Sequence, residues 1–182
     1  MKKILKWIFG GFVLILLVPI VCFLVYAGAA FLPEKGNIDQ IIASASFEDS
    51  HVSEDIRSLI KASVNTDQKP SWSVARLLVP KYRTNERGFV QSWQLQWAAW
   101  TALVDLVYGD DEVYTLFCAS VYNGEGYGLN ELSIRMFGKP LSTLSLDESA
   151  QVVAYTRAPN MYKNDIERLQ AVKTLLLRKV SQ

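Results

Sequence analysis

The sequence predicts an all-α protein, with one helical domain behind one N-terminal membrane helix. An uncharged apolar run lies near the N-terminus, and beyond it apolar residues recur at spacings of three and four, as on one face of a helix. Helix-capping residues precede these segments, and no stretch alternates between apolar and polar residues as a half-buried strand would. With 182 residues, 50% of them hydrophobic, the chain has room for one compact domain after the membrane segment.

The apolar run covers residues 8–32 and contains no charged side chain. About 20 apolar residues suffice to cross a bilayer as a helix, so we expect a single transmembrane helix here. Positive charge before the run places residues 1–7 in the cytoplasm and everything after Leu32 on the far side of the membrane. The flanking charges are Lys2, Lys3 and Lys6 before the run, and Glu34 and Lys35 after it.

A cleaved signal peptide is the alternative interpretation of this run. Ala27-Gly28-Ala29 matches the small-residue pattern of a cleavage site, but the run exceeds the roughly 7 to 15 residues of a signal core. Cys22 follows Val21 rather than a small residue, which disfavours a lipoprotein signal. Since Cys118 is the only other cysteine, we expect no disulfide within the chain.

The exported part divides into a polar linker, residues 33–52, and a helical domain, residues 53–182. After residue 7 the chain contains 16 Lys and Arg against 18 Asp and Glu, a formal charge of −2, which disfavours nucleic-acid binding. His51, the only histidine, lies in the linker and is expected to be solvated. With Cys118 on a helix, no zinc-ligand spacing is present, and we expect no metal and no cofactor.

The domain is predicted to be a succession of helices with short loops. Four residues are predicted to start helices: Ser53, Ser71, Asp110 and Asn164, and residues 89–108 should form a long helix that is apolar on most sides. Gly138 should end one helix, and a capping box of Ser145 and Glu148 should start another that reaches Arg157. The residues expected to point inward are Ile56, Leu59, Ile60, Val74, Leu77, Leu78, Val113, Leu116, Phe117, Val121, Leu146, Val153, Ile166, Leu169, Val172 and Leu176.

Four passages, in a fixed order, resemble the second half of the family-51 peptidoglycan glycosyltransferases. They are VYGDDEVYTLFCASVYNG (107–124), YGLNELSIRMFGKP (127–140), LSLDESAQVVAYTRAPNMY (144–162) and ERLQAVKTLLLRK (167–179). The resemblance implies a lysozyme-like α fold at the outer face of the bacterial inner membrane. Members of the family polymerise lipid II into glycan strands without a cofactor. The resemblance therefore implies lipid II or a glycan strand as ligand, and membrane lipid and cell-wall synthesis proteins as partners.

The catalytic positions of that family lie in its first half, where this chain departs from the pattern. The family's general base is the glutamate of A-S-E-D-x-x-F-x-x-H-x-G, and a second glutamate in R-K-x-x-E serves the donor diphosphate. In the register LIKASVN (59–65), Val64 takes the place of the first glutamate and Asn65 that of its aspartate. Counting back from Tyr108 without a gap puts Trp97 at the second glutamate. Neither Val64 nor Trp97 can serve as a base or balance charge.

A second register sets Ser53-Glu54-Asp55 on the S-E-D letters and keeps a carboxylate at Glu54. It then puts Lys61 at the motif's histidine and requires long gaps to the next motif.

The passage QKPSWSVARLLVPKYRTNER (68–87) also resembles the family, where a pair of glutamines stands at Ala75 and Arg76. Five residues that match family positions are our candidates for a binding cleft: Gln68, Ser71, Tyr127, Lys139 and Arg157. Glu125 lies in a region that borders the family's cleft. Trp93, Trp97 and Trp100 share one helical face, which indicates core packing or, as the alternative, a lipid-facing or partner-facing stripe.

Together these observations predict a membrane-anchored family-51-like domain that no longer polymerises glycan and acts as a binding or regulatory partner in cell-wall synthesis. The alternative is an active minimal glycosyltransferase that uses Glu54 or another carboxylate. A structural membrane scaffold fits the same pattern, since a fold does not dictate a function.

Overall fold

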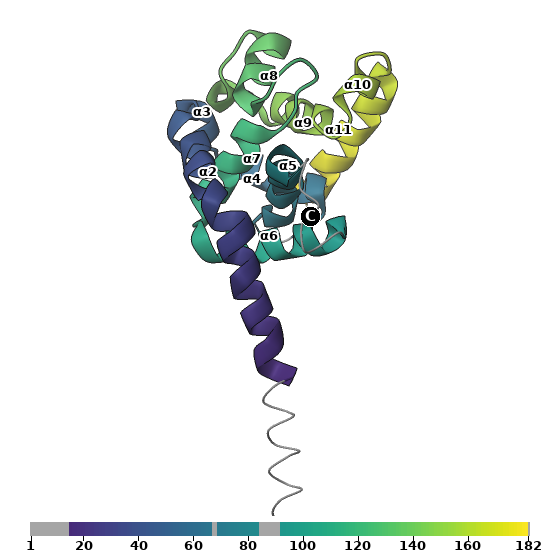
Figure 1. Ribbon diagram of the computed structural model, residues 1–182. Helices are drawn as coiled ribbons and strands as arrows, with labels where there is room; N and C mark the ends of the chain where they lie inside the picture. Colours follow the sequence, from purple (N-terminus) through teal and green to yellow (C-terminus); the bar gives the residue numbers. More distant parts are fainter. Residues whose placement is uncertain (1–14, 67–68, 84–91, 182) are drawn as a thin grey trace, which may run out of the picture. The chain divides into compact units, whose positions relative to one another are not determined.

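The computed structural model describes residues 15–66, 69–83 and 92–181, and within these ranges the regular structure is helical (Figure 1). The prediction of an all-α chain is therefore confirmed. The chain divides into two compact units, residues 1–37 and residues 38–182. Residues 33–52, which we expected to be a linker, instead form most of helix α2 (Leu32–Ser44) and all of α3 (Phe47–Ser50).

A long apolar helix runs from Ile15 to Ser44 in the described residues. Its most apolar 18-residue window has a mean hydropathy of 2.6 and is only 22% buried, so its length and composition suit a membrane anchor or a signal sequence. The helix widens into a π-helical turn, η1 (Ala27–Phe31), in which the N–H of Leu32 donates to the carbonyl of Ala27. Pro33 follows directly, and its ring would clash with a carbonyl four residues earlier in a regular α-helix, which accounts for the wider turn.

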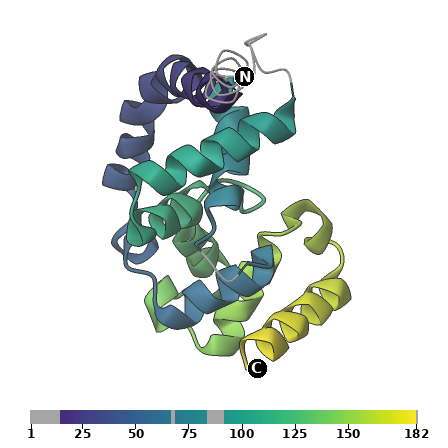
Figure 2. The same ribbon diagram turned by 90° about the horizontal axis from the view of Figure 1, so that it is seen from below.

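The second unit is built from helices of 4 to 15 residues and one short 3-10 turn. Beyond α3 they are α4 (Glu54–Val64), α5 (Ser71–Arg83), α6 (Trp93–Val107), α7 (Asp110–Ser120), α8 (Leu129–Phe137), η2 (Leu141–Thr143), α9 (Leu146–Tyr155), α10 (Pro159–Tyr162) and α11 (Ile166–Val180). Figure 2 shows two groups, with α5 packed along α6 in one and α4, α9 and α11 packed together in the other. Helix α7 contacts α3, α5 and α8.

The core follows the predicted apolar faces. In the first group Val74, Leu78, Trp100 and Val104 are fully buried. In the second group Leu59 and Ile60 of α4 meet the helices that carry the buried residues Val152, Val153, Leu169 and Leu176. Since burial of each such side chain stabilises a fold by about 1.5 to 3 kcal/mol, these faces account for much of the helix pairing.

Several predicted helix ends are confirmed. The Ser53 hydroxyl accepts the N–H of Ile56 at the start of α4, and Gly138 ends α8 with a positive φ of 67°. Ser145 and Glu148 form the predicted capping box of α9. The Glu148 carboxylate also accepts a 2.7 Å hydrogen bond from Lys139, and these contacts lower the pKa of Glu148 to about 2.

Three residues predicted to cap helix starts do not cap them: Asp110 and Ser71 are instead the first residues of their helices, and Asn164 lies one residue before the observed cap. Helix α7 is capped by Gly109, whose N–H donates to Glu112, so Asp110 is the first helical residue. Helix α11 is capped by Asp165, which accepts the N–H of Arg168, rather than by Asn164. In both cases two neighbouring residues have capping chemistry, and the sequence alone does not separate them.

Ser71 is also no cap, because it is the first residue of α5 and its hydroxyl donates to the Asp105 carboxylate. The predicted long helix 89–108 is shorter, since α6 ends at Val107 and begins at Trp93, and residues 84–91 lie outside the described residues.

Two residues that we expected to be buried are exposed. Leu146 is 42% exposed and Ile166 is 68% exposed. Each is the first residue of its helix, where the apolar spacing still fits but the neighbouring helices do not reach. Arg157, the predicted end of the helix that became α9, lies two residues beyond the observed end at Tyr155.

Candidate binding cavity

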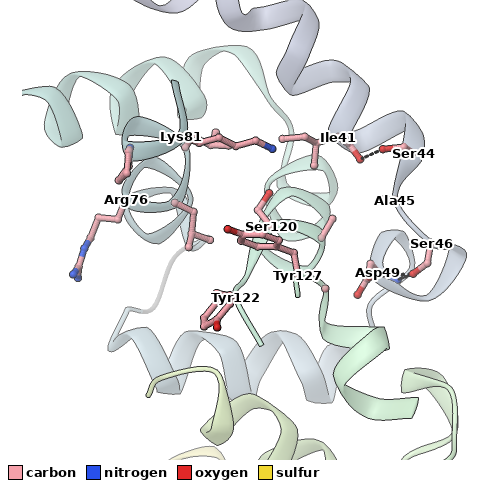
Figure 3. A pocket seen from close by; sticks show the side chains of 15 residues that line it. Ile41, Ser44, Ala45, Ser46, Asp49, Arg76, Lys81, Ser120, Tyr122 and Tyr127 are labelled. Carbon is pink, nitrogen blue, oxygen red and sulfur yellow. Dashed lines mark hydrogen bonds between the residues drawn. The ribbon is translucent and has the colours of Figure 1, made fainter. Parts of the chain in front are cut away.

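A cavity of about 750 Å³ lies within the second unit, between the end of α2, α3, α5, the end of α7 and the loop that follows α7 (Figure 3). This volume falls in the range of about 300 to 1,000 Å³ that is usual for small-molecule sites. The lining residues are Ile41, Ser44, Ala45, Ser46, Asp49, Arg76, Leu77, Leu78, Pro80, Lys81, Ala119, Ser120, Tyr122, Tyr127 and Gly128.

The wall of the cavity is mostly apolar and aromatic, and its charged edge is basic. Ile41, Leu77 and Leu78 contribute aliphatic surface. Arg76 and Lys81 are both exposed and come from α5. Lys81 extends toward Ile41, whereas the Arg76 side chain points away from the cavity and its guanidinium lies over the Trp97 ring (Figure 3). A concave apolar surface with a few convergent polar groups is the usual form of a ligand site.

Asp49 is the only carboxylate among the lining residues that the structure describes, and it is buried. Burial raises the pKa of Asp49, although three hydrogen bonds oppose this rise. One oxygen accepts the N–H of Asn130 at 2.9 Å, and the other accepts the Ser46 hydroxyl at 2.9 Å. A third bond comes from the N–H of Leu129. The carboxylate thus caps the N-terminus of α8, where the free N–H groups and the helix dipole favour negative charge.

We therefore expect Asp49→Ala to destabilise the domain by about 1 to 3 kcal/mol, because it leaves a buried N–H of α8 without its acceptor. Asp147→Ala is the matched control, since Asp147 is exposed and makes one surface ion pair, with Lys173 at 2.9 Å. Such a pair contributes about 0 to 1 kcal/mol. Denaturant unfolding of both variants measures the difference, and equal losses would contradict a capping role for Asp49.

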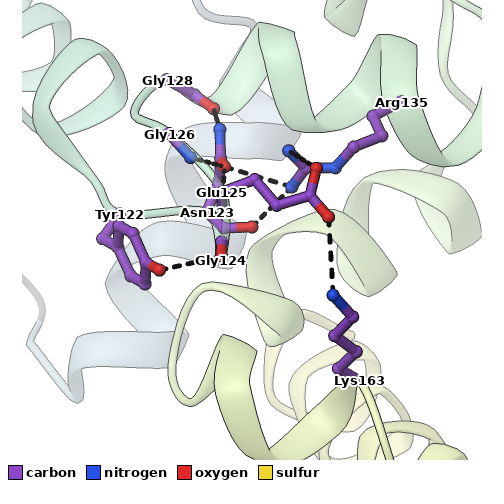
Figure 4. A network of polar contacts seen from close by, with 8 residues as sticks. All are labelled: Tyr122, Asn123, Gly124, Glu125, Gly126, Gly128, Arg135 and Lys163. Atoms are coloured by element: carbon purple, nitrogen blue, oxygen red, sulfur yellow. Dashed lines mark hydrogen bonds and ion pairs between the residues drawn. The ribbon is translucent and has the colours of Figure 1, made fainter.

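The loop after α7 places two tyrosines at the edge of the cavity. Tyr122 and Tyr127 form an antiparallel β-bridge, and their ring centroids are 5.8 Å apart. Asn123, which is fully buried between them in the chain, holds the loop closed (Figure 4). Its amide donates to the carbonyl of Gly128 at 3.1 Å and accepts the N–H of Gly126 at 2.9 Å.

Charged residues tie this loop to its neighbours. Arg135 of α8 donates to both the backbone and side-chain oxygens of Asn123. Glu125 lies 3.6 Å from Arg135 and 3.7 Å from Lys163, so its carboxylate serves surface ion pairs (Figure 4). Gly124 and Gly128 have φ values of 96° and 109°, which side chains rarely adopt. The loop is thus a fixed turn that presents the two tyrosine rings.

Of the five cleft candidates, Tyr127 is the one that lines this cavity. Ser71 is buried against Asp105, and Lys139 is paired with Glu148. Arg157 is exposed beyond the end of α9, and Gln68 lies outside the described residues.

The positions at which the sequence resemblance would put the family's glutamates do not line the cavity. Val64 is the last residue of α4. Asn65 follows it with a positive φ of 58° and accepts a 3.0 Å hydrogen bond from Lys179, at the edge of a separate, shallow hollow. Trp97 lies on α6, with its ring 6.1 Å from that of Trp72 and beneath the Arg76 guanidinium at 5.2 Å.

Glu54, the carboxylate of the alternative register, is the first residue of α4. Its side chain is 86% exposed, lies 3.7 Å from Arg57 and does not line the cavity. His51 stacks on Phe47 at 4.2 Å on the surface. Within the described ranges, no three potential metal ligands come together.

Sequence reasoning missed the segment that contributes Asp49. Ser46-Phe47-Glu48-Asp49 has the spacing of a helix cap, and the hydroxyl of Ser46 indeed accepts the N–H of Asp49. It also contains an adjacent Glu-Asp pair like that of the family's first motif. Neither of the two registers above places the motif on this pair. Glu48 accepts the N–H of Ser142 at 2.9 Å and is not among the residues that line the cavity.

No protein-family model matches this chain. The chain is similar to the uncharacterized protein YfeL of Salmonella typhimurium, with 27% identity over 175 residues. The alignment covers 93% of this chain and 90% of YfeL, so the likeness extends over nearly the whole of both proteins. Because YfeL is itself uncharacterized, the similarity assigns no activity to this chain.

Proposed function

We propose that this protein is a membrane-anchored, family-51-like binding protein of bacterial cell-wall synthesis that holds a lipid-linked anionic sugar and does not polymerise glycan. One observation carries this proposal. The cavity combines an apolar and aromatic wall with the basic side chain of Lys81 at its edge, while the carboxylate of Asp49 is already engaged as a helix cap.

The chemistry of the cavity suits an amphiphile with an anionic head. Leu77, Leu78 and Ile41 offer aliphatic contact, and the tyrosine rings offer stacking surface for a sugar. Lys81 is the group that would bind a diphosphate through charge-assisted hydrogen bonds, since the Arg76 guanidinium lies over the Trp97 ring. The four sequence passages that resemble family 51 support lipid II as the ligand, since that family acts on it.

The same residues argue against catalysis. Glycosyl transfer needs a carboxylate that can accept a proton near neutral pH, together with positive charge at the leaving diphosphate. Asp49 has both oxygens occupied by donors, and Glu54 is on the surface beside Arg57. An active minimal glycosyltransferase that uses Glu54 or another carboxylate remains the alternative.

Binding of lipid II to the full-length protein in nanodiscs tests this proposal. Lys81→Gln should weaken binding about 10-fold or more, because a hydrogen bond to a charged group contributes about 1.5 to 3 kcal/mol. Lys179→Gln is the control, since Lys179 is an exposed basic residue beside the separate hollow. If the unaltered protein fails to bind, or if Lys81→Gln binds like the control, the cavity is not the site.

The proposal also requires the second unit to lie outside the cytoplasm. A reporter enzyme that is active only outside the cytoplasm should be active when fused after Gln182, because the early lysines keep the N-terminus inside. Activity from a cytoplasm-only reporter at the same position would reverse the topology.

A further inference from the structure

The hydroxyl of Ser120, at the end of α7, is a buried polar group in the wall of the cavity. Its oxygen is shielded from solvent, and among the described residues no atom forms a hydrogen bond with it. Figure 3 shows its side chain among those that line the cavity. Buried polar atoms in proteins nearly always have a hydrogen-bond partner, so this exception requires an explanation.

The helix itself does not satisfy this hydroxyl. A serine or threonine within a helix often donates to the carbonyl four residues earlier. Thr115, in the same helix, does so with the carbonyl of Asp111 at 2.8 Å. Ser120 makes no such bond in the described part of the chain, and its side chain lines the cavity instead. The hydroxyl is therefore free to bind a molecule that occupies the cavity.

The other hydroxyls of the cavity wall differ from that of Ser120. Ser44, Ser46 and Tyr122 each donate a hydrogen bond to an oxygen of the protein. Tyr127 is 66% exposed, so its side chain is open to water. Within the described lining residues, Ser120 thus provides the buried hydroxyl that is left for a ligand.

The surroundings of this hydroxyl suit a sugar better than a phosphate. Tyr122 follows Ser120 by two residues and forms the β-bridge with Tyr127, so two aromatic rings line the same cavity. Burial and the charge of Asp49 raise the pKa of the Cys118 thiol, which places Asp49 near this end of α7. A carboxylate repels a diphosphate, whereas it accepts hydrogen bonds from the hydroxyls of a sugar.

We infer that the Ser120 hydroxyl binds the sugar of the ligand, through a hydrogen bond with one of its hydroxyl or carbonyl oxygens. This inference rests on the proposed function, in which the cavity holds a lipid-linked sugar. A serine hydroxyl can both donate and accept, as recognition of a sugar hydroxyl requires. The diphosphate lies at Lys81, on a different helix. Ser120 therefore distinguishes a lipid that carries a sugar from the bare lipid diphosphate.

Binding of a polyprenyl diphosphate with and without a disaccharide tests this assignment. Unaltered full-length protein in nanodiscs is compared with Ser120→Ala, Lys81→Gln and Ser133→Ala. Ser133 is the matched control, because it is a buried serine outside the lining whose hydroxyl donates to the carbonyl of Lys139 at 2.7 Å. Thermal unfolding of each variant without the ligand reports any change in the stability of the fold.

We expect Ser120→Ala to weaken binding of the lipid with the disaccharide about 5-fold and to leave the bare diphosphate within about 2-fold, since one neutral hydrogen bond is lost. This variant should melt at or above the temperature of the parent, because it removes a buried hydroxyl that none of the described residues satisfies. Ser133→Ala should do the reverse, with a lower melting temperature and unchanged binding.

A Ser120→Ala variant that loses affinity equally for both lipids, or for neither, would overturn the assignment to the sugar. The proposed function would still stand in that case if Lys81→Gln weakens the binding of both lipids. If the unaltered protein binds neither lipid, the proposed function fails and the inference fails with it.

Discussion

Val153→Asp should destabilise the second unit by about 3 to 5 kcal/mol, a large part of the roughly 5 to 15 kcal/mol that is usual for a domain. Val153 is fully buried on α9, which packs against α4 and α11. An aspartate there would either stay ionised without a partner or take up a proton at neutral pH, and both cost free energy. Thermal or denaturant unfolding of the detergent-solubilised protein, followed by circular dichroism, measures the loss.

Leu146→Asp is the control within the same helix. Leu146 is exposed in the first turn of α9, where a negative charge interacts favourably with the helix dipole. We therefore expect a change within about 0.5 kcal/mol. If both variants lose the same stability, or if Val153→Asp melts within a degree or two of the parent, the packing of α9 described above is wrong.

The helices themselves were largely predictable, because their signals are local. Apolar spacing located α4, with Ile56, Leu59 and Ile60 buried as expected. The capping box of α9 and the end of α8 at Gly138 were also predicted from single residues and their neighbours. Each of these features depends on a few positions in sequence, so no knowledge of the tertiary structure was needed.

The cavity was much less predictable, because it is formed by segments that are far apart in the chain. Asp49 belongs to α3, a helix of four residues that is too short to show apolar periodicity and lies in a region we took for a linker. Its role becomes visible only when Asn130, 81 residues later, is placed beside it. Burial at helix starts was misjudged for a related reason, because spacing does not reveal where a neighbouring helix stops.

The tryptophans of α6 illustrate the same limit. Their shared face was predicted, and two interpretations were left open: core packing, or a lipid-facing or partner-facing stripe. The structure shows that the tryptophans differ in exposure, since Trp100 is fully buried whereas Trp93 is about half exposed. The exposed residues Leu95, Ala98, Ala102 and Leu106 lie on the opposite side of the helix.

The second large effect concerns chemistry. We expect the unaltered protein to form no glycan polymer from lipid II at any pH between about 5 and 9, because Asp49, the only carboxylate among the described lining residues, is engaged by hydrogen-bond donors, and the expected register puts Trp97 at the family's second glutamate. Each such contribution is typically worth about 10² to 10⁴ in rate. Val64→Glu alone should not restore activity, since position 64 lies at the end of α4 and away from the cavity. Rescue by this single change would show that the rest of a catalytic site is intact.

Two carboxylates outside the cavity lining supply the matched variants for that experiment. Glu54→Gln removes the candidate of the alternative register, and Glu48→Gln removes the glutamate next to Asp49. Both side chains are at the surface or bound to a backbone N–H, so neither variant should change stability by more than about 1 kcal/mol. Neither should change the outcome of a polymerisation assay if the protein is a binding protein.

The central claim is that the protein binds lipid II without polymerising it. The most direct test is one experiment on purified full-length protein in vesicles that contain labelled lipid II. We predict that the protein retains the lipid in a pull-down while gel analysis of the same sample shows lipid II alone, without longer glycan. Processive polymer from the unaltered protein that disappears on Glu54→Gln or Glu48→Gln would contradict the account and identify an active glycosyltransferase.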